Sequence, residues 1–212
     1  MRTRRQTSKK IADAVYERGL LPLLDFAYLG FGDGIQQDAT ALLEFARPGA
    51  ELLVASSYSK NFGLYSERVG ALTLVTGSRD VAKTTDSQLK STIRTNYSNP
   101  PQHGAAIVAT ILSDADLTAQ WDSELAAMRD RINGMRKLFT QKMSERLPDR
   151  DFTFIEQQRG MFSYSGLTPG QVDRLREEHS IYIVRDGRIN VAGISQSNVD
   201  ALTSAVATVL AE

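Results

Sequence analysis

The order strand, helix, strand over residues 20–57 constrains the fold more than any other feature of the sequence. Residues 20–27 and 52–55 form two short apolar runs rich in aliphatic side chains, the pattern of buried strands. The spacing of apolar residues over about 35–45 predicts a helix between them. This order predicts a parallel βαβ unit, in which the two strands are often neighbours.

A carboxylate and an amine stand where these two strands end. Asp25 interrupts the first apolar run, and Lys60 follows the second. A carboxylate within such a run is costly unless a cation or hydrogen bonds satisfy it. Parallel strands present their carboxyl ends at one sheet edge, where open α/β folds bind ligands, so we expect Asp25 and Lys60 to lie together. Burial can make such a lysine nucleophilic, and the alternative is an ordinary solvated lysine in a surface loop.

The segment around Lys60 also suits a phosphate group. Hydroxyl side chains occur at Ser56, Ser57, Ser59 and Ser66, and Arg68 follows them. Hydroxyls and a guanidinium are the groups that a phosphate dianion needs. An acid for a cationic ring nitrogen, a lysine and a phosphate cup together meet the requirements of pyridoxal phosphate.

Composition excludes several classes of function. Lys plus Arg and Asp plus Glu number 25 each, so net charge gives no indication of nucleic acid or an anionic membrane as a partner. The sequence has no cysteine, and His103 and His179 show no metal-ligand pattern. No run approaches the ~20 apolar residues of a membrane span. The basic start before Asp13 is expected to be solvated and frayed rather than a transit peptide, and we expect a cytoplasmic protein.

A long helix is predicted in the middle of the chain, with Ser113 as its N-cap and Pro148 closing it. Its apolar stripe, read as core packing, consists of Leu117, Trp121, Leu125, Met128, Ile132, Met135, Phe139 and Met143. Such a helix is ~45 Å long, enough to bridge two domains. Other expected helices cover about 8–18, 80–93, 104–112, 168–179 and 197–210, with a polar turn over 94–101. Further strands are expected near 69–76, 152–155, 161–165, 181–184 and 188–191.

Five segments resemble the aspartate and aromatic amino acid aminotransferases, which are class I, fold-type I pyridoxal phosphate enzymes. They are LLDFAYLGF at 23–31, SSYSKNFGLYSERVG at 56–70, IRTNYSNPP at 93–101, GMFSYSGL at 160–167 and GRINVAG at 187–193. The resemblance implies an α/β fold. Residues 1–113 would be part of the cofactor-binding large domain with its mostly parallel sheet, 114–147 a long interdomain helix, and 148–212 a small C-terminal α+β domain.

The resemblance also implies roles around the cofactor. Lys60 resembles the lysine that holds pyridoxal phosphate as a Schiff base and, once released, moves the proton between the substrate Cα and the cofactor. Asp25 resembles the partner of the pyridine nitrogen, which keeps that nitrogen protonated. Tyr28 resembles the tyrosine that hydrogen-bonds the phenolic oxygen of the cofactor.

Phosphate and substrate residues follow from the same resemblance. Ser57 and Arg68 match the phosphate cup, and Ser59 is a secondary candidate. Arg188 resembles the arginine that clamps the substrate α-carboxylate, a bidentate task that lysine performs poorly. Arg94 resembles the arginine that binds the distal carboxylate of dicarboxylic substrates across a dimer interface. No metal ligand is expected.

The implied reaction is transamination between an acidic L-amino acid and 2-oxoglutarate, with aromatic donors left open, in a family whose intact members form homodimers. The N-terminal half of that family is not in this sequence. Three large-domain strands without their neighbours would expose an unpaired edge and an apolar face. We therefore expect the isolated chain to be weakly active or inactive. The alternative function is that of a truncated, non-catalytic remnant that binds pyridoxal phosphate weakly or only associates with partner chains.

Overall fold

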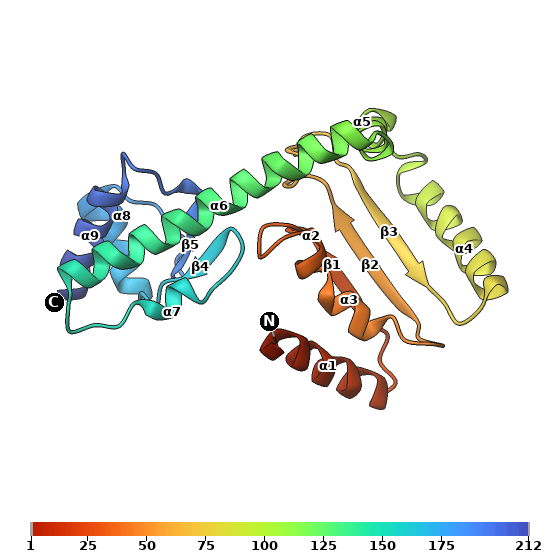
Figure 1. Ribbon diagram of the computed structural model, residues 1–212, viewed down its shortest axis with the longest axis horizontal. Helices are drawn as coiled ribbons and strands as arrows, with labels where there is room; N and C mark the ends of the chain where they lie inside the picture. Colours follow the sequence, from red (N-terminus) through yellow and green to blue (C-terminus); the bar gives the residue numbers. More distant parts are fainter. Residues whose placement is uncertain (1, 212) are drawn as a thin grey trace. The chain divides into compact units, whose positions relative to one another are not determined.

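A computed structural model describes residues 2–211, which divide into two compact units. The first holds residues up to 30 together with 34–125, and the second holds 31–33 and the residues from 126 onward. Each unit has its own small sheet, and the architecture is mixed α/β (Figure 1).

The sheet of the first unit contains the predicted parallel pair. Strands β1 (Leu23–Phe26) and β2 (Leu52–Ser57) are parallel, with Asp25 opposite Ala55, and β3 (Gly70–Val75) runs antiparallel to β2. The connection between β1 and β2 holds two short helices, α2 (Ile35–Asp38) and α3 (Thr40–Phe45), where one helix was predicted. The Thr40 hydroxyl donates to the carbonyl of Gln37 at 2.7 Å, a local bond of the kind that competes with a continuous helix.

Helices α1 (Arg2–Glu17) and α3 cover one face of this sheet (Figure 1). The core between them contains four buried residues, Ala12, Phe45, Leu52 and Val54. The prediction of a frayed start is wrong, because α1 begins at Arg2. Its first turns are tied to α3 by the pair of Arg5 Nε and Glu44 Oε1 at 2.7 Å.

The opposite sheet face and the outer edges are open in the described part of the chain. Strands β1 and β3 each have one neighbour, β2. Side chains alternate along a strand, so Leu23 and Leu72 share the face that α1 and α3 leave uncovered. They are 61% and 50% exposed. The expected unpaired edge and apolar face are therefore confirmed.

Three helices follow the sheet: α4 (Arg79–Tyr97), α5 (Gln102–Ser113) and α6 (Ala115–Arg146). The polar turn predicted from residue 94 begins only at Ser98, since α4 continues to Tyr97. The predicted N-cap of α6 is also wrong. Asp114, not Ser113, accepts from the amides of Asp116 and Leu117, at 2.9 and 3.0 Å. A carboxylate at this position satisfies two free amides of the first turn.

The apolar stripe of α6 is buried along most of its length. Leu125, Ile132, Phe139 and Met143 are core residues. Leu117 and Met128 are each 40% exposed, so the prediction of core packing is wrong for these two. The helix contributes residues to both units, since the division falls after Leu125.

The second unit contains α7 (Thr153–Glu156), β4 (Phe162–Tyr164), α8 (Pro169–His179), β5 (Arg188–Asn190), the short 3-10 helix η1 (Val191–Gly193) and α9 (Val199–Ala211). Strands β4 and β5 are antiparallel. The expected strand at 152–155 is instead the helical turn α7, begun by Asp151 accepting from the Thr153 amide at 2.8 Å. The expected strand at 181–184 is absent from the described sheets.

Candidate functional site

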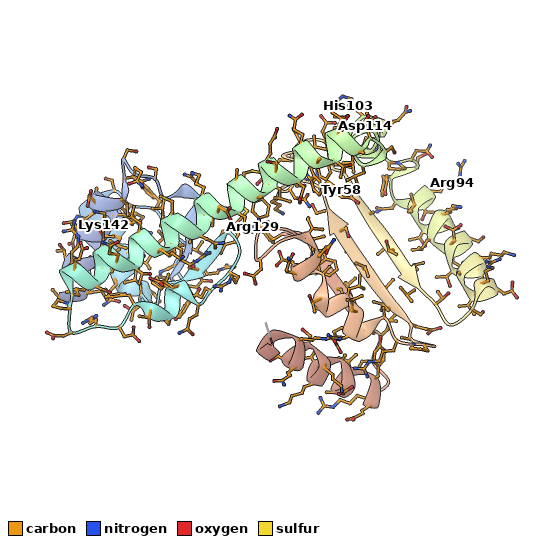
Figure 2. All side chains as sticks on the ribbon, viewed as in Figure 1. Tyr58, Arg94, His103, Asp114, Arg129 and Lys142 are labelled. Atoms are coloured by element: carbon orange, nitrogen blue, oxygen red, sulfur yellow. The ribbon has the colours of Figure 1, made fainter. Side chains whose placement is uncertain are left out.

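The loop that carries Lys60 begins directly after β2 and is fixed from two sides. The amide of Tyr58 bonds to the carbonyl of Val69 at 3.2 Å, and Figure 2 shows Tyr58 at the carboxyl end of β2. On the other side of Lys60, the Trp121 indole N–H of α6 donates to the carbonyl of Asn61 at 2.7 Å. These bonds hold the lysine backbone at the end of β2.

Lys60 and Tyr28 are brought together. The Lys60 Nζ lies 4.6 Å from the centroid of the Tyr28 ring. Tyr28 follows the end of β1, and β1 is parallel to β2, so both residues occupy the carboxyl edge of this strand pair. An ammonium over an aromatic face is attracted by the ring quadrupole. The loop therefore fixes the amine as well as the backbone of Lys60.

Asp25 occupies the same edge but is not buried in apolar surroundings. It lies on the open face of β1, and its Oδ1 accepts from the Ala27 amide at 3.0 Å. Its neighbours Leu24 and Phe26 point to the core side instead. The expected cost of a carboxylate within an apolar run does not arise, because strand alternation leaves this side chain exposed.

The predicted phosphate residues gather where β2 ends and β3 begins. Ser57 Oγ donates to Ser59 Oγ at 3.2 Å, and the Ser59 amide donates to Ser57 Oγ at 3.3 Å. Ser57 lies opposite Gly70, two residues beyond Arg68. Arg68 is exposed, donates to the carbonyl of Tyr65 at 2.9 Å and has a φ of 52°. Such a left-handed conformation is strained for a non-glycine residue and is often found at functional sites.

Asn61 is a feature of this loop that the sequence reasoning missed. It is buried, and its Nδ2 donates to the carbonyl of Leu29 at 3.4 Å, which joins the loops after β1 and β2. Its Oδ1 is buried without a hydrogen-bond partner among the described residues. A buried carbonyl of this kind is costly. Its position next to Lys60 was the only available signal.

The two predicted substrate arginines belong to other elements. Arg94 is in the last turn of α4, and its side chain points outward from that helix (Figure 2). Arg188 belongs to the second unit, where it lies in β5 opposite Tyr164 and pairs with Asp186 Oδ2 at 2.9 Å. The structure thus places Lys60 in contact with Tyr28, and Ser57 in contact with Ser59. Arg94 belongs to α4 and Arg188 to β5.

The described residues, 2–211, contain no group of three or more His, Asp or Glu side chains placed to hold a metal ion. Across the same residues, none of the helices combines the length and the apolar character that crossing a bilayer requires.

Comparison with known proteins gives consistent matches along the chain. The model of the family "aminotransferase class I and II" matches residues 3–206. The chain is 55% identical over 200 residues to an aspartate aminotransferase of Salmonella typhi, covering 94% of this chain and 50% of that protein. It is 46% identical over 202 residues to the aromatic-amino-acid aminotransferase of Escherichia coli (strain K12), covering 93% of this chain and 51% of that protein.

Solved structures agree with these matches. The aromatic-amino-acid aminotransferase of Burkholderia pseudomallei, solved covalently bound to pyridoxal phosphate, superposes with a TM-score of 0.93 at 52% sequence identity. That superposition covers 96% of this chain and 51% of the other. The chain therefore spans about half the length of the relatives it matches.

Proposed function

Because the chain belongs to the aminotransferase class I and II family, we propose that it forms the lysine-bearing part of a pyridoxal phosphate-dependent aminotransferase. Its fold is part of the fold-type I transferase fold. The observation that carries the proposal is the contact of Lys60 Nζ with the Tyr28 ring at the carboxyl edge of β1 and β2. An amine held at this edge is the group that an aldehyde cofactor requires.

The side chains at this edge have the chemistry that pyridoxal phosphate needs. Lys60 supplies an amine for the aldehyde, and Asp25 supplies a carboxylate for the pyridine N–H. Tyr28 supplies a phenol for the ring hydroxyl oxygen. The phosphate would be held by donors on the neighbouring loop, namely Ser57, Ser59 and Arg68. The donor set fits the group.

When bound, pyridoxal phosphate supplies an electron sink for the bonds at the substrate Cα. Lys60 would hold the cofactor and then act as the base that moves the Cα proton. Asp25 would accept a hydrogen bond from the ring N–H and so keep the proton on that nitrogen. Tyr28 would orient the ring through its hydroxyl.

The proposed reaction is transamination between an acidic L-amino acid and 2-oxoglutarate. Arg188 would clamp the α-carboxylate, and Arg94 would bind the distal carboxylate of a dicarboxylic substrate across a homodimer interface. Aromatic donors remain within the proposal, because the matched relatives include both aspartate and aromatic-amino-acid aminotransferases. A homodimer and a cytoplasmic location are part of the same proposal.

A second candidate function is a non-catalytic remnant that binds pyridoxal phosphate weakly or only associates with partner chains. The observation that favours it is the match to only half of each relative, together with the open edges of the β1-β2-β3 sheet. On this proposal the chain holds the lysine but lacks the remaining walls of the pocket.

Titration of the purified chain with pyridoxal phosphate separates the proposals. We expect a visible absorption band from lysine-bound cofactor, its loss in Lys60→Ala, and its retention in Lys83→Ala, a control at an exposed lysine of α4. No band at saturating cofactor would contradict the claim that this chain alone builds the site. If the band forms, transamination of aspartate and 2-oxoglutarate at a rate near that of intact relatives would exclude the remnant, whereas negligible turnover would support it.

A further inference from the structure

Asn61, the residue after Lys60, is bonded to two other elements at once. Its backbone carbonyl accepts from the indole N–H of Trp121 in α6 at 2.7 Å. Its side-chain Nδ2 donates to the carbonyl of Leu29, in the loop after β1, at 3.4 Å. Asn61 is only 5% exposed, and all of these residues belong to the first unit. A single buried residue therefore joins α6, the Lys60 loop and the loop that carries Tyr28.

Three aromatic rings hold the Lys60 loop from positions on both sides of the lysine in the sequence. The Phe62 ring stacks on the Trp121 ring, with 4.5 Å between the ring centroids and 18° between the ring planes. The Tyr58 ring meets the Phe62 ring edge to face, with the centroids 5.4 Å apart. Both geometries are favourable for aromatic pairs beyond the area that they bury. Because Tyr58 and Phe62 are each two residues from Lys60, their contact restrains the backbone that carries the lysine.

The two bonds of Asn61 act where they can set the position of the Lys60 amine. Lys60 Nζ lies over the Tyr28 ring, and the side-chain bond of Asn61 joins the residues that follow these two in the chain. Without the Trp121 N–H, the Asn61 carbonyl would lose its donor in a part-buried position. That loss costs free energy unless the loop turns this carbonyl toward water. Such a turn would move the base of the Lys60 side chain away from the Tyr28 ring.

We propose that Asn61 and Trp121 are positioning residues that set the Lys60 amine over the Tyr28 ring. Both act through the loop backbone, so neither has to touch the cofactor. The inference deepens the proposed function and rests on it for the role of Lys60 in holding pyridoxal phosphate. The competing interpretation is that Trp121 belongs only to the apolar packing of α6 and that Asn61 only fills space between the loops.

Reductive methylation with isotope-labelled formaldehyde, read by NMR, tests the proposal on the full chain without cofactor. The reaction places two labelled methyl groups on each lysine Nζ and preserves its positive charge. An amine over an aromatic face lies in the shielding region of the ring, so the Lys60 methyl signal should lie upfield of those of the exposed Lys83 and Lys90. Lys60→Arg assigns the signal, and Tyr28→Leu should abolish the upfield shift.

Two substitutions remove the proposed bonds while keeping much of the packing. Trp121→Phe keeps an aromatic ring against Phe62 and removes the N–H. Asn61→Leu keeps the size of the side chain and removes the bond to Leu29. It also removes the buried Oδ1 that has no partner among the described residues, so its two effects on folding stability oppose each other. We expect each variant to move the Lys60 methyl signal to the position of the exposed lysines.

Each substitution has a matched control in the second unit. Phe139→Leu changes another ring of α6, one that is 2% exposed. Asn198→Leu removes a similar bond, from Asn198 Nδ2 to the Gly193 carbonyl at 3.0 Å. Both controls should leave the Lys60 methyl signal in place. Circular dichroism and thermal melting verify that each variant is folded, and Phe62→Leu, which removes the ring stack from the loop side, replaces a variant that does not fold.

Cofactor affinity gives a second readout. We expect Trp121→Phe and Asn61→Leu each to weaken the dissociation constant for pyridoxal phosphate at least about fivefold, and the two controls less than about twofold. Affinity for pyridoxal phosphate that stays within about twofold of the parent in Trp121→Phe and Asn61→Leu would contradict the proposal.

The methyl signal can overturn the proposal by itself. The contradicting results are a Lys60 signal that is not shifted in the parent, a shift that survives in Trp121→Phe or Asn61→Leu, and an equal loss of the shift in the controls. If the parent chain binds no pyridoxal phosphate, the proposed function fails, and the methyl signal still decides whether these two residues position the amine.

Discussion

At the scale of single residues, the structure gives Lys60 a defined setting. Its loop is anchored by bonds from Tyr58 and Trp121, and its amine contacts the Tyr28 ring. Asp25 and Tyr28 come from the end of the neighbouring parallel strand. A short stretch of chain therefore carries the cationic, acidic and phenolic groups of the proposed site.

Arg136 is a second residue whose position constrains its role. It is 2% exposed, and its guanidinium donates to Ser163 Oγ, to Asn133 Oδ1 and to the Gly160 carbonyl. Burial, with the nearby Arg159 as a smaller cause, lowers the pKa of Arg136 below its usual value. The side chain fastens α6 to β4, the strand that pairs with the Arg188 strand β5.

We expect Arg136→Met to destabilise the chain by about 3 kcal/mol, because it leaves three buried or part-buried acceptors without a donor. Urea unfolding followed by circular dichroism measures the change. Lys137→Met, at the exposed neighbour on the same helix, is the control and should change stability by less than about 0.5 kcal/mol. Equal stability of the two variants would show that the Arg136 bonds contribute little.

At the scale of elements, an acidic side chain joins α6 to α9. Asp200 Oδ1 lies 2.7 Å from Lys142 Nζ and 3.6 Å from Arg146 NH2. The hydrogen bond from Lys142 is the largest effect and lowers the pKa of Asp200; desolvation is the next largest and opposes it, and the charges of Lys142 and Arg146 lower the pKa further. The folded state therefore holds the ionised form more strongly than the unfolded state does.

This lowered pKa predicts how stability changes in acid. The contribution of Asp200 should be fully present above the unfolded-state pKa of about 3.9 and be lost as pH falls through the lower folded-state pKa. The melting temperature of Asp200→Asn should therefore fall less steeply below about pH 4 than that of the parent chain. Asp122→Asn, at an exposed aspartate of α6, is the control. Parallel pH profiles for Asp200→Asn and the parent would refute the assignment.

The open face of the β1-β2-β3 sheet leads to a prediction about self-association. Leu23→Lys and Leu72→Lys should each reduce concentration-dependent association in sedimentation velocity, because each places a charge on an exposed apolar sheet surface. Leu112→Lys in α5, where the leucine is 46% exposed, is the control and should leave association unchanged. If all three variants associate like the parent, the open sheet face is not the contact surface.

The elements also show which parts of the fold the sequence could predict. The β1–β2 pair followed from two apolar runs, and the helix expected over about 168–179 is α8, which a capping box of Thr168 and Gln171 begins in the structure. Residues 152–155 were mispredicted as a strand because one side chain, Asp151, starts a helical turn there. The strand at 181–184 was predicted from propensity alone, and no described segment pairs with it. The spacing of apolar residues does not show which strand a segment pairs with, or which side chain starts a helical turn.

For the site, residue types were easier to predict than their surroundings. Lys60 and Tyr28 lie in contact because parallel strands end at one edge, which the βαβ order implies. The exposure of Asp25 depended on which strand face the helices cover, and the unpartnered Oδ1 of Asn61 depended on loop packing. The spacing of residues in the sequence predicts neither the exposure of Asp25 nor the unpartnered Oδ1 of Asn61, because tertiary contacts determine both.

At the scale of the whole molecule, the chain consists of two units that share the helix α6, and it matches half of each relative. In the first unit, the outer edges of β1 and β3 have no strand partner among the residues that the structure describes. The open edges and the half-length match favour the second candidate function, in which the chain holds the lysine within an incomplete pocket.

The claim on which the account depends is that Lys60 is the residue that holds the cofactor. Borohydride reduction of the chain with pyridoxal phosphate, followed by proteolysis and mass spectrometry, measures which amine is modified. The account predicts modification at Lys60 at low cofactor concentration, with the exposed lysines 83 and 90 modified only at much higher concentration. Modification spread over the exposed lysines, with Lys60 no more reactive than the others, would contradict it.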